Sequence, residues 1–150
     1  MRIEHKSFEE LTKSELYAIL RLRVEVFVVE QDCPYQELDD WDQVARHFFI
    51  RNQSDAIIAT LRVCPPDTRY ASASFGRVVV KEINRNEGLG KVLMTKALNW
   101  LRGNYANCSV QISAQTYLKK FYERFGFEQV GEGYLEDGIP HIGMILNNID

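Results

Sequence analysis

The clearest chemical feature of the sequence is a glycine-containing loop between a predicted strand and a predicted helix. Residues 75–82 are rich in β-branched side chains, and residues 88–102 carry apolar side chains at helical spacing. Gly88 and Gly90 lack a Cβ where the backbone must approach another group, and the helix presents its free N–H groups and positive dipole end at the same place. This combination is typical of a phosphate-binding site.

Two common phosphate-binding motifs do not fit this loop. A Rossmann fingerprint needs a third glycine where Leu93 stands, and a P-loop needs a glycine and a Ser or Thr where Arg85 and Val92 stand. What remains is Arg-x-x-Gly-x-Gly after a valine-rich strand. Taken alone, this pattern also fits an ordinary strand-to-helix turn.

A second candidate site is an acidic segment within residues 30–45. It holds four acids within six positions: Glu37, Asp39, Asp40 and Asp42. One interpretation is a solvated loop. The other is that one or two of these carboxylates face a cleft, bind a cationic amine and accept its proton.

The composition indicates a single domain over residues 1–150. The chain is 45% hydrophobic and 26% charged, and its net charge of -3 argues against nucleic acid or an anionic membrane as an obligate partner. No apolar run approaches the roughly 20 residues that span a bilayer, and the first ten residues lack a signal-peptide core. We therefore predict a cytoplasmic protein with small-molecule ligands.

The cysteines and histidines suggest no metal site. They are Cys33, Cys64, Cys108, His5, His47 and His141. Neither a C-x-x-C pair nor a histidine spacing typical of metal ligands occurs. We expect reduced thiols and no bound metal.

The hydrophobic patterns predict a mixed α/β fold. Strands are expected at 2–8, 46–52, 56–64, 75–82, 109–114, 127–135 and 140–147, and helices at 13–29, 88–102 and 116–125. Thr12 and Glu15 form a capping box before the first helix, whose apolar stripe is Leu16, Leu20, Val24 and Phe27. Strands 75–82 and 109–114 flank a helix, so they should be parallel neighbours in a mixed sheet with helices on both faces.

A second motif makes a family resemblance specific. Residues 122–127, Tyr-Glu-Arg-Phe-Gly-Phe, end the last predicted helix at the expected distance after the Arg85 loop. The two motifs and the order of elements resemble the GNAT (GCN5-related) N-acetyltransferase family. Residues 23–31, 37–42 and 137–141 look more narrowly like its ElaA-like branch.

The resemblance implies transfer of an acetyl or other acyl group from acetyl-CoA to a primary amine by direct attack in a ternary complex. It places the pantetheine arm along the main chain of Val78, Val79 and Val80, with the Val80 N–H directed at the thioester carbonyl. It places Gln115 near the same arm, where many relatives have Asn, and gives Tyr122 the role of proton donor to the departing thiolate. The pyrophosphate would lie on seven consecutive N–H groups: Arg85, Asn86, Glu87, Gly88, Leu89, Gly90 and Lys91.

Several points stay open at this stage. Candidates for the general base are Glu30, Asp39, Asp42, His47, Glu82 and His141. The acceptor is a small amine or a peptide amine, and a homodimer is possible. Alternatives are a non-catalytic acetyl-CoA-binding module, an acyl-enzyme formed on Cys33, and a purely structural Tyr122 in the core.

Overall fold

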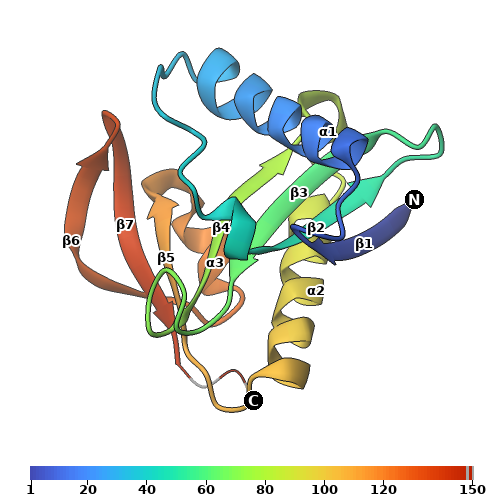
Figure 1. Ribbon diagram of the computed structural model, residues 1–150. Helices are drawn as coiled ribbons and strands as arrows, with labels where there is room; N and C mark the ends of the chain where they lie inside the picture. The colour runs from blue at the N-terminus through green and yellow to red at the C-terminus, as the bar shows by residue number, and fades with distance from the viewer. Residues whose placement is uncertain (148, 150) are drawn as a thin grey trace.

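The computed structural model describes residues 1–147 and 149, and its centre is a seven-stranded sheet (Figure 1). The strand order is β1-β2-β3-β4-β5-β7-β6. The strands are β1 (Arg2–Ser7), β2 (Arg46–Arg51), β3 (Ile57–Cys64), β4 (Ala73–Val80), β5 (Val110–Gln115), β6 (Glu128–Glu136) and β7 (Ile139–Leu146). The α-helices are α1 (Lys13–Val24), α2 (Leu89–Asn104) and α3 (Lys119–Glu123). The predicted element order and mixed α/β fold are confirmed.

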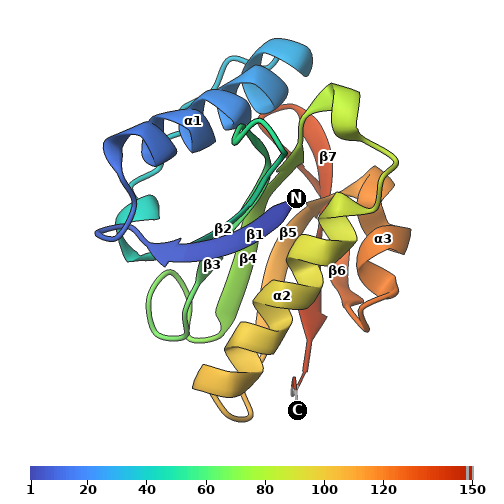
Figure 2. The same cartoon turned by 90° about the vertical axis from the view of Figure 1, so that its right-hand side faces the viewer.

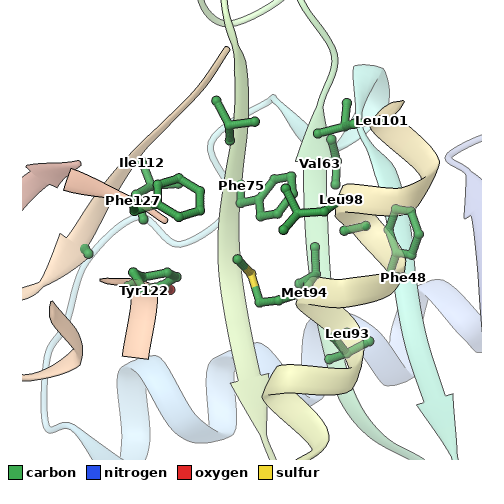
Figure 3. Close-up of a cluster of buried hydrophobic side chains, with 14 of the residues drawn as sticks. Phe48, Val63, Phe75, Leu93, Met94, Leu98, Leu101, Ile112, Tyr122 and Phe127 are labelled. Carbon is green, nitrogen blue, oxygen red and sulfur yellow. The ribbon is translucent and has the colours of Figure 1, made fainter. Parts of the chain in front are cut away.

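The helices cover both faces of the sheet, with α1 on one face and α2 and α3 on the other (Figure 2). The larger core lies under α2, where Leu93, Met94 and Leu101 pack against Phe48 and Phe75 (Figure 3). A smaller cluster lies under α1: Leu22, Val26 and Val79. No helix in the described part of the chain is long and apolar enough to cross a membrane.

The first helix begins as predicted but buries a different face. The Glu15 N–H donates to Thr12 Oγ1 at 3.0 Å and the Thr12 N–H donates to Glu15 Oε1 at 2.9 Å, which completes the capping box. The buried face carries Ile19, Leu22, Arg23 and Val26, whereas Val24, part of the predicted stripe, is 39% exposed. The stripe prediction was therefore wrong, because a buried arginine occupies the inner face. The last turn, η1 (Glu25–Glu30), is a π-helix.

Strands β4 and β5 are parallel, as predicted, but they pair only at Ala73 with Val110 and Ser74 with Gln111. Beyond these pairs the two strands diverge (Figure 1). The edges of β4 and β5 that face each other are then free of strand partners. This opens a gap in the middle of the sheet.

A bulge in β4 lies beside this gap. Thr60 of β3 pairs with Val79, but Arg62 pairs with Gly76, so β4 carries one extra residue between these pairs. Arg77 lies at the bulge with a φ of 53°, which is uncommon for a residue with a side chain. The bulge bends β4 next to the place where the gap opens.

Candidate active site

The loop before α2 has the backbone geometry of an anion site. Gly88 is the N-cap residue with a φ of 76°, and no side chain caps the first N–H groups of α2. Asn86 also has a positive φ, of 67°. The first turn of α2 therefore keeps free N–H donors at its positive dipole end. A Cβ on Gly90 would lie 3.5 Å from the Phe121 ring, an ordinary van der Waals contact, so Phe121 of α3 packs beside the start of α2.

The side chain of Arg85 ties this loop to its surroundings. Its guanidinium forms two hydrogen bonds to Glu30, at 2.7 and 2.9 Å, and its Nε donates to the Val80 carbonyl at 3.1 Å. The loop is thus fixed to the end of η1 and to the end of β4. Glu30, one of the candidate bases, is committed to this ion pair.

The backbone of Val80 points into the gap. The N–H of Lys81 donates to Ile58 of β3 at 2.8 Å. Because successive residues of a strand direct their N–H and C=O groups to opposite edges, those of Val80 point away from β3. The Val80 N–H therefore faces the gap, and its use there as a donor stays a prediction.

A cavity of about 280 Å³ lies at the gap and is lined both by residues near the end of η1 and by residues of α3. Its wall includes Val78 of β4, Gln115 of β5, Tyr122 of α3 and His141 of β7. Gln115 and Gln31 face each other there at 3.4 and 3.5 Å. Four side chains from separate predicted elements therefore meet at one cavity.

Tyr122 lines this cavity and also belongs to the larger core. Its ring makes edge contacts with Phe121 and Phe127, at centroid distances of 5.1 and 5.9 Å, and Figure 3 shows it beside Phe127. Among residues 1–147 and 149 its hydroxyl has no hydrogen-bond partner, although the residue lines the cavity. Burial raises the pKa of Tyr122 well above its usual value, so the hydroxyl holds its proton.

His141 is held in a defined orientation in the same cavity. Its Nδ1–H donates to the Ile139 carbonyl at 2.7 Å, which leaves Nε2 3.3 Å from Glu136 Oε2. Glu136 also accepts a hydrogen bond from Ser113 at 3.2 Å, and the Ser113 hydroxyl is hydrogen-bonded to the Tyr134 hydroxyl. His141 pairs directly with Gln115 across β7 and β5, and both residues line the cavity.

The acidic segment does not form a free carboxylate cluster. Arg23 binds Glu37 at 2.5 and 2.7 Å and Asp42 at 2.6 Å, and Arg62 binds Asp39 at 2.5 and 2.7 Å. The third arginine, Arg77, binds Glu37 at 3.0 Å and Asp39 at 3.2 Å, while Asp40 is exposed. Neither interpretation of the segment holds for the three paired acids, because their carboxylates are occupied by arginines rather than by water or an amine.

These contacts also make three of the candidate general bases unsuitable for that role. Burial acts to raise the pKa of Asp39 and Asp42, but the bonds to Arg62 and Arg23 outweigh it and leave the pKa of both below the usual range. His47 is buried away from the cavity and donates to the Asp42 carbonyl at 2.9 Å, and burial lowers its pKa. Carboxylates with lowered pKa values are weak bases, and His47 has no access to an acceptor.

A family model described as an acetyltransferase (GNAT) domain matches residues 9–147. The chain belongs to the GNAT family. The protein ElaA of Escherichia coli K12 is 43% identical over 136 residues, which are 90% of this chain and 89% of ElaA. The chain is therefore an ElaA-like member of the GNAT family, as its motifs predicted.

Solved structures agree with this assignment. A crystal structure of an acyl-CoA N-acyltransferase from Pseudomonas aeruginosa superposes with a TM-score of 0.91 at 43% identity, covering 97% of this chain and 99% of that one. The structure of Escherichia coli ElaA gives a TM-score of 0.89 at 39% identity with the same coverage. GNAT membership supports acyl transfer from an acyl-coenzyme A as the class of reaction.

The sequence reasoning missed two parts of this GNAT site. Glu136 and Ser113 were not recognised, although the turn at Asp137 and Gly138 brings β6 beside β7 and sets Glu136 opposite Ile139. The residues described contain no group of His, Cys, Asp or Glu arranged to hold a metal.

The thiol of Cys33 lies in the cavity wall and donates to the Asp137 carbonyl at 3.4 Å.

Proposed function

We propose that this protein is an N-acyltransferase that moves an acetyl group from acetyl-CoA directly to a primary amine. One observation carries the proposal: the gap between β4 and β5 lies beside the anion-binding turn of α2 and at a cavity that contains both Tyr122 and His141. The donor can lie in the gap while the acceptor occupies the cavity. Both substrates are then bound together, as direct attack requires.

The donor site is made by backbone. The free N–H groups at residues 88–91 would bind the pyrophosphate, and the unpaired edge of β4 would hold the pantetheine arm as an added strand. The N–H of Val80 would donate to the thioester carbonyl oxygen as negative charge develops there. Each of these groups is already oriented before a ligand binds.

Two side chains would handle the protons. Nε2 of His141 accepts a proton from the acceptor amine, because its Nδ1–H is committed to Ile139. Glu136 stabilises the imidazolium that forms. Tyr122 gives its proton to the departing sulfur of CoA, for which its raised pKa keeps it in the protonated form.

The other two functions considered fit the site less well. A module that only binds acetyl-CoA has no use for an oriented histidine or a protonated tyrosine with a free hydroxyl in the cavity. The Cys33 thiol donates to the Asp137 carbonyl, and within the described residues no histidine, lysine or arginine is hydrogen-bonded to its sulfur to activate it for attack on a thioester.

The test is a CoA-release assay with acetyl-CoA and a panel of amines, amino acids, polyamines and peptides. Release that depends on an amine and is lost in Tyr122→Phe supports the proposal. Mass spectrometry after incubation with acetyl-CoA alone separates the mechanisms: unmodified protein agrees with direct transfer, and an acetyl group on Cys33 contradicts it. Absence of amine-dependent release throughout the panel, with CoA bound, would favour the binding module.

A further inference from the structure

The cavity wall carries hydrogen-bond donors that have no acceptor among the described residues. Arg69, Tyr70 and Ser74 all line the cavity, and within the described residues none of their side chains has an acceptor or a carboxylate partner. Ser74 is only 5% exposed. Its hydroxyl lies at the cavity wall without a hydrogen-bond partner among the described residues, so it is free to donate to a ligand there.

These three donors lie near one another. The Arg69 guanidinium stacks over the Tyr70 ring at 5.3 Å, which holds the cation in place. Ser74 pairs directly with Cys64 across β4 and β3, so their side chains share one face. Arg69 and Tyr70 are adjacent in the loop between β3 and β4, and both line the cavity together with Ser74.

The other arginine of the cavity wall is already neutralised. Arg77 is bound to Glu37 and Asp39, and Asp39 is bound to Arg62 as well. Arg69 has no such partner among the residues described. Its positive charge is therefore available to a ligand in the cavity.

We propose that Arg69, Tyr70 and Ser74 form a subsite for an anionic group on the acceptor, a carboxylate or a phosphate. This inference rests on the proposed function and narrows it, because the acceptor then carries an amine at one end and an anion at the other. A guanidinium with two hydroxyl donors is suited to either oxyanion.

The strand registers set the length of such an acceptor. Ser74 is level with Gln111, whereas His141 is level with Gln115, four residues further along β5. Four residues of strand span about 13 Å, and the Arg69 side chain can shorten the path. The acceptor is therefore elongated, and its amine and anion are separated by several bonds, unlike those of an α-amino acid.

The test compares matched acceptors with acetyl-CoA held saturating. ω-Amino carboxylates of increasing chain length, from glycine upward, are compared with alkylamines of the same length and with ω-aminoalkyl phosphates. We expect kcat/KM to rise with length for the two anionic series and to exceed that of the matched alkylamine at least tenfold. The series with the lower KM identifies carboxylate or phosphate as the preferred anion.

Variants separate the subsite from general charge effects. Arg69→Gln should raise KM for the best anionic acceptor at least tenfold, with kcat within twofold, and leave alkylamine kinetics unchanged. Arg69→Lys should restore part of the loss, and Ser74→Ala should give a smaller increase. Arg21→Gln, which removes an exposed arginine on α1, is the matched control and should have no effect.

An unchanged KM in Arg69→Gln, in protein with wild-type thermal melting, would overturn the subsite and leave the acyltransferase proposal standing. If no amine is acetylated at all, the acyltransferase proposal fails, and the subsite is then judged by binding alone. For that purpose 6-aminohexanoate and 6-aminohexyl phosphate are titrated into labelled protein and followed by NMR. Shifts centred on Ser74 that vanish in Arg69→Gln support an anion subsite, and no shifts with either probe overturn it.

Discussion

Arg23 and Asp42 lie 19 residues apart in the sequence, and Nη1 of Arg23 is 2.6 Å from Oδ1 of Asp42. Arg23 is only 1% exposed, and its other partner is Glu37, which in turn binds Arg77 at the β4 bulge. The pair therefore belongs to a buried network that joins α1, the acidic segment and β4. This network holds the segment over the cavity and fixes the bulge beside the gap.

Removing the central cation should be strongly destabilising. Arg23→Leu leaves Glu37 with one partner fewer and Asp42 dependent on Arg62, and breaking a buried pair in this way costs about 3–5 kcal/mol. Urea unfolding gives the change in the free energy of unfolding. The matched control is Arg2→Leu, which breaks the exposed pair with Asp55 and should cost less than about 1 kcal/mol. Equal small losses in both variants would mean that the network contributes little to stability.

The same network should make the free energy of unfolding depend on pH. The pKa values of Asp39 and Asp42 are lower in the folded protein than the ~3.9 of an unfolded aspartate, although burial by itself would raise them. A carboxyl with a lowered folded-state pKa stabilises the fold fully above its unfolded pKa and loses that contribution as the pH falls. We expect the free energy of unfolding to drop steeply below about pH 4.

Asp39→Asn removes one of these groups and should flatten the drop. The free energy of unfolding is measured by urea titration at neutral pH and again at pH ~3 for both proteins. A wild-type protein whose stability is the same at both values would contradict the lowered pKa values.

The parts of this site that depend on neighbouring residues in the sequence could be predicted, and the parts that depend on tertiary contacts could not. The loop at Gly88 and the position of Tyr122 depend on local signals: glycine spacing, a strand-to-helix change and a short motif. The partners of Arg23 are brought together only by the fold. In the sequence these partners are separated by 14 and 19 positions, and nothing in it indicates that a buried arginine lies on the inner face of α1.

The acceptor side was less predictable for the same reason. Acids in a run suggest attraction for a cation, but their effect depends on arginines at positions 23, 62 and 77, which lie on three different elements. Nothing in the sequence distinguishes Arg69 from other charged residues in loops. Only the structure shows that Arg69 has no ion-pair partner among the described residues.

The loop before α2, which we propose binds the pyrophosphate, should be sensitive to a side chain at Gly88. Gly88→Val places a side chain where a pyrophosphate must approach and strains a backbone with a φ of 76°, so CoA affinity should fall at least tenfold, about 1.4 kcal/mol. Calorimetric titration with CoA measures the change. Gly131→Val is a close control, since Gly131 has the same φ and equally open surroundings but lies on β6. If both variants bind CoA equally well, the pyrophosphate does not lie at this loop.

Tyr122 should affect turnover and leave donor binding nearly unchanged. Tyr122→Phe removes only the hydroxyl, and loss of a general acid lowers kcat by roughly a hundredfold when departure of the thiolate limits the rate. The affinity for acetyl-CoA is measured separately by calorimetry. Tyr17→Phe, which changes an exposed tyrosine on α1, should behave as wild type. Normal turnover in Tyr122→Phe would return this residue to a structural role in the core.

His141 should be needed most when the acceptor amine is protonated. His141→Gln keeps a polar side chain of similar size but cannot take up the proton, so kcat/KM near neutral pH should fall by roughly 10²–10⁴-fold. As the pH approaches the amine pKa of ~10, free amine becomes available without a base and the deficit should narrow. Glu136→Gln, which weakens the partner of the imidazolium, should give a smaller loss with the same trend. His5→Gln, on β1, is the control. Initial rates measured from pH 7 to pH 10 distinguish a general base from a positioning residue. If the loss of kcat/KM in His141→Gln stays constant over this range, His141 shapes the cavity and does not accept the proton.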